Sequence, residues 1–243
     1  MNEYSNSVIA SAAALVTQMP QRVVQIQTLL QQHVQEAVPS KLRAKFAQAI
    51  LAAPAAVGSN GNVQSLLAVV ADAIAQLLSD LHLLRVWITL LVPKVEDGNN
   101  FGVEVQKLVY VHLKESMEKW QKTWDSLADY SSARATAVEK VNAKISSETS
   151  TTTTLTSSTG GKDGNEEKSV TAKVEKQSNT GNQAPEDAVA AVVELDVKWF
   201  FNLACALEGV RDQYAITEDV ILKNKTKIEL PRGTNDRAGF NMF

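Results

Sequence analysis

A helix cannot easily run through residues 93 to 102, which read Pro93-Lys94-Val95-Glu96-Asp97-Gly98-Asn99-Asn100-Phe101-Gly102. Proline lacks the backbone N–H that a helix interior needs, and it pushes the residue before it out of the helical region. Asp97-Gly98 is a turn signal, and the side chain of Asn100 can cap a following helix by accepting an unpaired backbone N–H. The stretch therefore predicts an acidic turn between two helices.

Long amphipathic segments lie on both sides of this turn. Apolar residues recur with a helical period in four segments, at about residues 7–36, 62–92, 101–145 and 186–230. Pro20 should kink the first segment, and a short amphipathic piece near 42–51 follows it. The third and fourth segments would each be roughly 65 Å long at 1.5 Å per residue, so they need partners along their whole length. We therefore expect an all-α fold, an elongated four-helix up-down-up-down bundle.

The periodicity also predicts which side chains are buried. In the third segment the apolar stripe includes Leu108, Val109, Trp120 and Trp124. The single cysteine, Cys205, lies among leucines and alanines, so we expect a packed thiol and not a nucleophile. One cysteine cannot form a disulfide framework.

Residues 146–185 differ from the rest in composition. They are dominated by Ser, Thr, Gly, Lys, Glu and Asn and contain a run of four threonines. Such a segment cannot bury enough apolar surface to offset its ordering entropy, so we expect a disordered linker. The predicted organisation is helices one to three in 1–145, the linker, helix four in 186–230 and a flexible tail in 231–243. Up-down-up-down connectivity then places the turn 93–102 at the same end of the bundle as the tail.

Composition and charge argue against two classes of partner. The net charge of −3 does not favour nucleic acid, which needs a clustered basic surface. The richest apolar run, Leu81 to Val92, is too short to span a bilayer and contains His82 and Arg85. No secretory signal is recognisable at the N-terminus, so we expect a soluble protein of the cytoplasm or nucleus, or both.

Little in the sequence suggests an enzyme. Neither a phosphate-binding glycine loop nor a dinucleotide-binding glycine pattern is present. The three histidines, His33, His82 and His112, are isolated on different expected helices, and Glu186-Asp187 fits a helix start after Pro185. We expect no catalytic residues, no metal site and no cofactor.

Three blocks of sequence resemble the 11S proteasome activators, a family that opens the 20S proteasome without ATP. Pro93 with residues 95–103 and 105–106 resembles the family's activation loop. Residues 219–224, followed by Lys227-Ile228 and Pro231-Arg232-Gly233, resemble the end of its last helix. Met19-Pro20 and the residues after it are similar, more weakly, to its kinked first helix. The long insert lies at 146–185, whereas in the family it usually joins the first two helices.

The resemblance implies a homoheptameric ring that docks on the α-subunits of the 20S proteasome. The implied gate-opening loop comprises Lys94, Val95, Glu96, Asp97, Gly98, Asn99, Asn100, Phe101 and Gly102. Asp97 aligns as the first contact residue and Glu96 as the second. The implied proteasome-binding tail comprises Pro231, Phe240, Asn241, Met242 and Phe243. The alternative is a helical-bundle scaffold or adaptor that does not engage the proteasome, which would explain the helices but not the ordered blocks.

Overall fold

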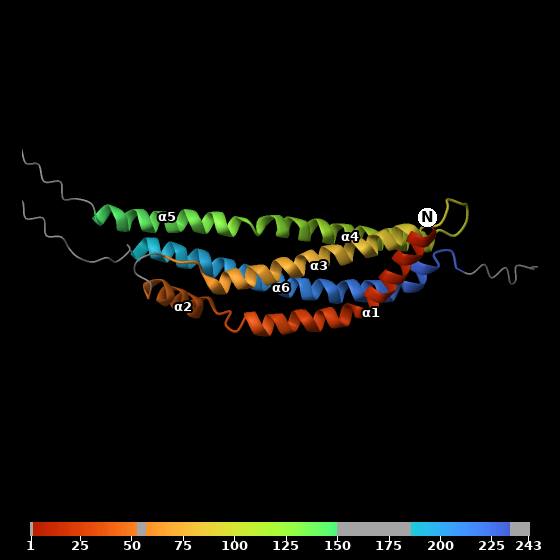
Figure 1. Cartoon of the computed structure of the whole chain (residues 1–243). Coiled ribbons are helices and arrows are strands. Elements are labelled where there is room, and N and C mark those ends of the chain that lie inside the picture. The colour runs from red at the N-terminus through yellow and green to blue at the C-terminus, as the bar shows by residue number, and fades with distance from the viewer. Residues whose placement is uncertain (1, 53–56, 150–185, 234–243) are drawn as a thin grey trace, which may run out of the picture.

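The computed structural model describes residues 2–52, 57–149 and 186–233, and these contain helices but no strands. The helices are α1 Asn2–His33, α2 Pro39–Leu51, α3 Gly61–Leu91, α4 Phe101–Ser126, α5 Asp129–Thr149 and α6 Glu186–Glu229. Figure 1 shows them side by side in one elongated bundle. The predicted all-α bundle is confirmed. The helices number six within this part of the chain because the piece near 42–51 forms α2 and the third segment is divided.

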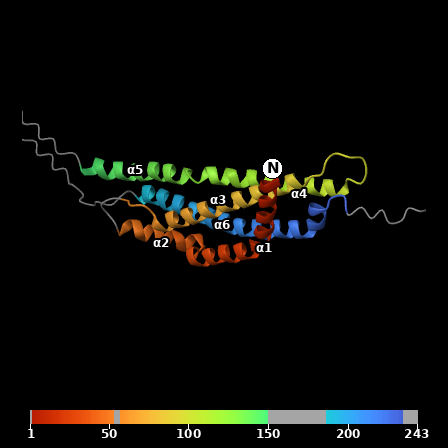
Figure 2. The same cartoon turned by 45° about the vertical axis from the view of Figure 1, so that its right-hand side comes forward.

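The bundle is built around α3 and α6. Helix α6 contacts each of the other five, and α3 contacts α1, α4 and α6. In Figures 1 and 2, α4 and α5 follow each other along one side, and α1 and α2 lie along the opposite side. The first part of α1 crosses the other helices steeply in both views. Pro20 lies inside α1, and a proline at that position explains the bend.

Helix α3 is apolar over a longer stretch than the sequence analysis suggested. A window of 18 residues within Gly61–Leu91 has a mean hydropathy of 1.6, which is enough in length and composition to cross a membrane. The prediction that the richest apolar run is Leu81 to Val92, too short to span a bilayer, was therefore wrong. The physical reason is the position of α3 at the centre of the bundle, where it contacts three helices and buries residues from Val63 to Ile88. A core helix passes the same hydropathy test as a membrane span.

The third predicted segment is interrupted at residues 127 and 128. The backbone N–H of Leu127 donates to the carbonyl of Trp124 at 3.1 Å, three residues back, whereas a regular α-helical bond reaches four residues back. Asp129 then starts α5, where its charge favours the positive end of the helix dipole. Helix α5 extends to Thr149, four residues into the segment predicted to be the linker. The remainder of that predicted linker, 150–185, lies outside the described residues.

Three side chains predicted to be buried are exposed. Leu108 is 69% exposed, Trp124 is 38% exposed, and Cys205 is exposed. The buried stripe of α4 runs through Gly102, Gln106, Val109, Leu113, Ser116 and Trp120. Leu108 and Trp124 lie off this stripe, whose buried positions alternate at spacings of four and three residues. On α6 the buried residues nearest to Cys205 in the sequence are Leu203, Ala204 and Leu207, and Cys205 itself lies off this buried face.

Two buried carboxylates connect the helices within the core. Asp196 of α6 accepts hydrogen bonds from the Tyr130 hydroxyl at 2.9 Å, from Arg134 Nε at 2.9 Å and from Asn60 Nδ2 at 3.0 Å. Only 1% of Asp196 is exposed. Burial, and then the charge of Asp196, raises the pKa of Tyr130 above its ordinary range. This network connects α6 to α5 and to the residue that caps α3.

Asp80 of α3 forms the second network. It accepts a hydrogen bond from the Tyr214 hydroxyl at 2.7 Å and one from Gln76 at 2.9 Å, and it lies 3.7 Å from Arg22 Nε. Burial, and then the bond to Asp80, raises the pKa of Tyr214. A buried charge must be paired or hydrogen-bonded. Because the partners of Asp80 come from α1, α3 and α6, the network connects these three helices.

Candidate functional site

The turn between α3 and α4 has the geometry that its sequence predicts. Helix α3 ends at Leu91 because Val92, next to Pro93, takes an extended backbone with φ −65° and ψ 122°. Gly98 has φ +133°, a conformation that L-residues with a side chain rarely adopt. A Cβ at Gly98 would meet nothing within 4 Å, so the glycine is needed for the backbone and not for space.

The start of α4 is capped by a different asparagine from the one predicted. Asn100 occupies the N-cap position but makes no side-chain cap hydrogen bond. Instead, Oδ1 of Asn99 accepts from the backbone N–H of Phe101 at 3.1 Å. An asparagine side chain bonds readily to the backbone two residues on, and this turn lets Asn99 take the capping role.

The loop presents an exposed surface at the end of the bundle. Every residue from Lys94 to Phe101 is exposed, with Val95 at 102% and Phe101 at 65%. Figure 1 shows the loop projecting at the end where α6 also finishes. The predicted loop and the start of the predicted tail are therefore close together, as the connectivity requires.

The end of α6 turns back toward the loop. The backbone N–H of Leu230 donates to Thr226 at 2.9 Å and that of Gly233 to Leu230 at 3.1 Å. Gly233 has φ +74°, the left-handed conformation common after a helix. Pro231 is half-buried. The other predicted tail residues, Phe240, Asn241, Met242 and Phe243, lie outside the described residues.

Arg232 connects this turn to the loop. Its Nη1 lies 2.7 Å from Oε2 of Glu96, and its Nη2 donates to the carbonyl oxygen of Lys94 at 2.6 Å. Charge-assisted hydrogen bonds of this length are among the stronger ones in proteins. Within the described part of the chain, Asp97 makes no such contact, so of the two loop acids Glu96 is paired and Asp97 is left open to an external partner.

Two buried contacts lie beneath the loop. Nε2 of Gln106, a fully buried residue of α4, donates to the carbonyls of Leu91 at 3.1 Å and Ile228 at 2.7 Å. These carbonyls belong to the last turns of α3 and α6, where helices leave such groups unpaired. A Cβ on Gly102 would lie 2.0 Å from the carbonyl oxygen of Pro231, so α4 and the α6 end meet backbone to backbone.

Sequence reasoning did not find these two connecting side chains. Arg232 and Gln106 both fall inside blocks that carry the family resemblance, but nothing in their local pattern predicts a partner more than 100 positions away. A buried glutamine on an otherwise apolar helix stripe is the one physical signal. Such a side chain needs hydrogen-bond partners, and helix ends supply them.

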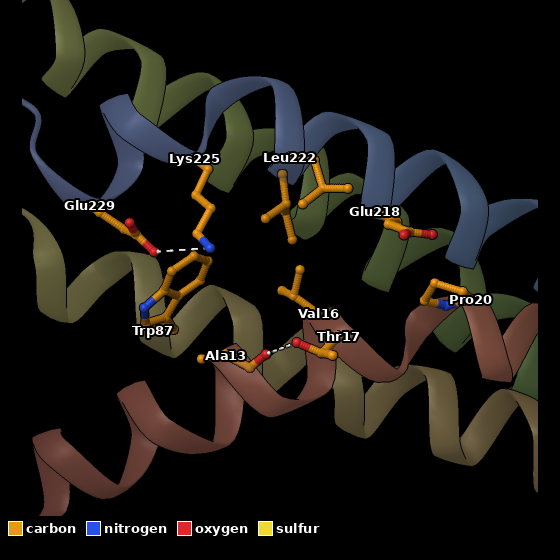
Figure 3. A pocket seen from close by; sticks show the side chains of 10 residues that line it. Ala13, Val16, Thr17, Pro20, Trp87, Glu218, Leu222, Lys225 and Glu229 are labelled. Atoms are coloured by element: carbon orange, nitrogen blue, oxygen red, sulfur yellow. Dashed lines mark hydrogen bonds and ion pairs between the residues drawn. The ribbon is translucent and has the colours of Figure 1, made fainter.

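Pockets also lie elsewhere in the described part of the chain, and one of about 250 Å³ lies beside Asn60, Arg134 and Asp196, whose polar groups bond to one another. A pocket of about 180 Å³ lies between α1, α3 and α6, with Trp87, Val16 and Leu222 on its walls (Figure 3). Of its three charged side chains, Lys225 and Glu229 pair with each other at 3.9 Å, and Glu218 also lies on the wall. No group of three His, Cys, Asp or Glu side chains converges within the described ranges, and the histidines lie on α1, α3 and α4.

Comparison with known proteins gives two kinds of match. The family model "Proteasome activator PA28, C-terminal" matches residues 56–150 and 143–238. The human protein "Proteasome activator complex subunit 3" is 27% identical over 177 residues, which cover 73% of this chain. The chain matches about half the length, 55%, of that relative.

Two solved structures share the fold. The 11S subunit of the Plasmodium falciparum proteasome, PA28, superposes with a TM-score of 0.65 at 20% identity, covering 95% of this chain and 92% of that one. The second is an archaeal 20S proteasome in complex with a mutated P26 activator. It matches with a TM-score of 0.64 at 14% identity, covering 98% of this chain and 99% of that one. Because the family model spans most of the sequence, the chain belongs to the proteasome activator PA28 family.

Proposed function

We propose that this protein is an ATP-independent activator of the 20S proteasome. Seven copies form a ring, their C-terminal tails dock on the α-subunits, and the loop 93–102 moves the gate aside so that peptides enter and are hydrolysed. Membership of the PA28 family supports the proposal, and one structural neighbour is an activator in complex with a 20S proteasome. The protein itself makes and breaks no bond, needs no cofactor, and acts in the cytoplasm or nucleus.

One observation carries the proposal. The exposed acidic loop and the start of the tail lie at the same end of the bundle and are joined through Arg232. An activator needs both elements on the face that meets the proteasome. A scaffold that never docks has no need to join an acidic turn to the start of the predicted tail.

The pairing of the two loop acids refines the role of each. Glu96 is held by Arg232, whereas Asp97 has no hydrogen bond or ion pair to the described residues. A carboxylate that is already paired is a poorer contact for a new partner. We therefore assign the gate contact to Asp97, the residue that the resemblance ranked first.

Exposed apolar side chains support self-association. Leu108 of α4 is 69% exposed, and Phe201, Ile216 and Leu222 of α6 are 45% to 51% exposed. They lie on the exposed sides of α4 and α6. Side-by-side copies would cover such residues, as a ring requires.

The test is a peptidase assay with purified latent 20S particles and a short fluorogenic peptide, without ATP. Wild-type protein should raise hydrolysis. Asp97→Ala should dock equally well and compete with wild type, but fail to stimulate. Asp187→Ala is the matched control, because it removes an exposed aspartate at the opposite end of α6. Native mass measurement should give seven copies.

Asn99→Tyr is a second loop variant, and it tests the geometry of the loop and not a single contact. It removes the cap of Phe101 as well as changing the loop surface, so it should reduce stimulation through loop geometry. Failure of wild-type protein to raise hydrolysis or to bind the 20S particle would favour the scaffold. Full stimulation by Asp97→Ala would refute the loop assignment alone.

A further inference from the structure

One guanidinium group holds two points of the loop at once. Nη1 of Arg232 contacts the Glu96 carboxylate, 136 positions away, and Nη2 contacts the main-chain carbonyl of Lys94. The Arg232 side chain is 26% exposed, whereas that of Glu96 is 67% exposed. Arg232 is thus the more buried partner, and Glu96 of the loop binds to it from the more exposed side. Binding both a side chain and the backbone constrains the path of the loop between Lys94 and Glu96.

Contacts of the neighbouring residues also hold the backbone of Arg232 in place. It lies between Pro231, whose backbone meets α4 at Gly102, and Gly233, which closes a turn on Leu230. Beneath it, Gln106 joins the last turns of α3 and α6. Arg232 therefore connects the loop to the place where α3, α4 and α6 contact one another. The predicted tail starts at the same place.

We propose that Arg232 is the positioning residue of the loop. It holds Lys94 to Glu96 against the start of the tail, and this fixes the direction in which Asp97 is presented. The loop then keeps a fixed position relative to the start of the tail. Docking of the tail therefore determines the position of the loop on the partner. This inference rests on the proposed function for its purpose, but the constraint on the loop exists in the free protein.

Lysine cannot replace arginine in this role. A guanidinium donates through several N–H groups in a fixed plane, and here two nitrogens serve two acceptors. An ammonium is a compact point charge on a flexible stem. Arg232→Lys should therefore keep the charge and recover only part of the constraint, which separates positioning from simple charge.

The first test uses the free protein and a protease that cleaves after lysine. Cleavage after Lys94 requires the loop to leave the arginine. In Arg232→Gln its rate should rise roughly threefold to tenfold, the size expected for losing charge-assisted bonds at a partly exposed site. Glu96→Gln should have a smaller effect because the Lys94 carbonyl contact persists. Lys227→Gln, which removes an exposed charge from the last turn of α6, should leave the rate unchanged.

The second test separates docking from opening by titrating the 20S particle with each variant. For Arg232→Gln the half-maximal concentration should stay within about twofold of wild type, while maximal stimulation falls at least about twofold. The double variant with Glu96→Gln should be no worse than Arg232→Gln alone, because both act through one contact. Arg232→Lys should fall between wild type and Arg232→Gln.

Two results would overturn the inference. The first is an unchanged cleavage rate after Lys94 in Arg232→Gln. The second is a raised half-maximal concentration with unchanged maximal stimulation, which would make Arg232 a docking residue. If Arg232→Gln does not fold, Arg232→Lys is judged by the same two readouts. Failure of wild-type protein to stimulate would refute the proposed function, and the cleavage test would still decide the constraint.

Discussion

Gly102 and Pro231 touch through bare backbone: a Cβ on Gly102 would lie 2.0 Å from the Pro231 carbonyl oxygen and 2.6 Å from its Cα. The two residues come from the start of α4 and the turn after α6. No side chain larger than hydrogen fits between them, so the loop and the tail start depend on one glycine for their approach.

Gly102→Ala should force the two segments apart. The added methyl meets backbone atoms that cannot rotate away, so we expect a loss of stability of about 1–3 kcal/mol, typical of overpacking. The displaced turn should carry Arg232 away from the loop. Stimulation of peptide hydrolysis should fall with it, and thermal unfolding at fixed protein concentration should show the lower stability.

Gly61→Ala is the matched control for that substitution. It lies at the start of α3, and its Cβ would meet nothing within 4 Å. The variant should be neutral or slightly stabilised, because alanine loses less entropy on folding than glycine. Equal behaviour of the two alanine variants would contradict the close approach at Gly102.

The sequence predicts the backbone of the loop well because its determinants are local. Pro93 ends a helix by its own chemistry, and Gly98 supplies the positive φ without help from neighbours. The capping residue was one position wrong, since Asn99 and Asn100 are chemically identical and the turn decides between them. The helices were predicted for the same reason, from a repeating apolar pattern.

The contacts that hold the loop could not be predicted in this way. Whether Arg232 meets Glu96 depends on how α3, α4 and α6 finish relative to one another, which no local pattern encodes. Leu108 and Cys205 show the same limit, because an apolar residue on an amphipathic helix can face solvent or another copy of the chain. The interruption after Ser126 is a small tightening of the helix and disturbs the apolar period too little to be read.

Asp196→Ala should be among the most destabilising single changes in the described core. It removes the partner of Arg134, whose side chain is 11% exposed, and leaves a buried charge without compensation. Such changes cost about 3–5 kcal/mol. Glu194→Ala, two residues away, removes only the exposed ion pair with Arg43, so it should change stability far less. Urea unfolding at fixed protein concentration compares them, and similar losses would refute the distinction.

Stability should fall at high pH through the two buried tyrosines. Burial raises the pKa of Tyr130 and Tyr214, so the folded state keeps protons that the unfolded chain releases from about pH 10 upward. The stabilising effect is complete below that pH and is lost above it. Each retained proton contributes a slope of about 1.4 kcal/mol per pH unit.

Tyr130→Phe and Tyr214→Phe test this dependence one residue at a time. Near neutral pH each should lower stability by about 1 kcal/mol, the value of a lost hydrogen bond to Asp196 or Asp80. Above pH 10 each variant should lose stability less steeply than wild type, because one fewer proton is retained. Parallel curves of unfolding free energy against pH would show that these hydroxyls do not control the alkaline limit.

The tail should provide affinity and the loop should provide opening. Deleting Asn241 to Phe243 removes the apolar end of the chain and leaves Pro231, Arg232 and the loop contacts in place. We expect a ring that assembles normally but no longer co-migrates with the 20S particle. Each tail alone is a weak ligand, and tethered tails gain through effective concentration. Affinity should therefore fall steeply in mixed rings as the number of intact tails decreases. A tail-deleted ring that still stimulates hydrolysis would show that the loop and its junction are sufficient for docking.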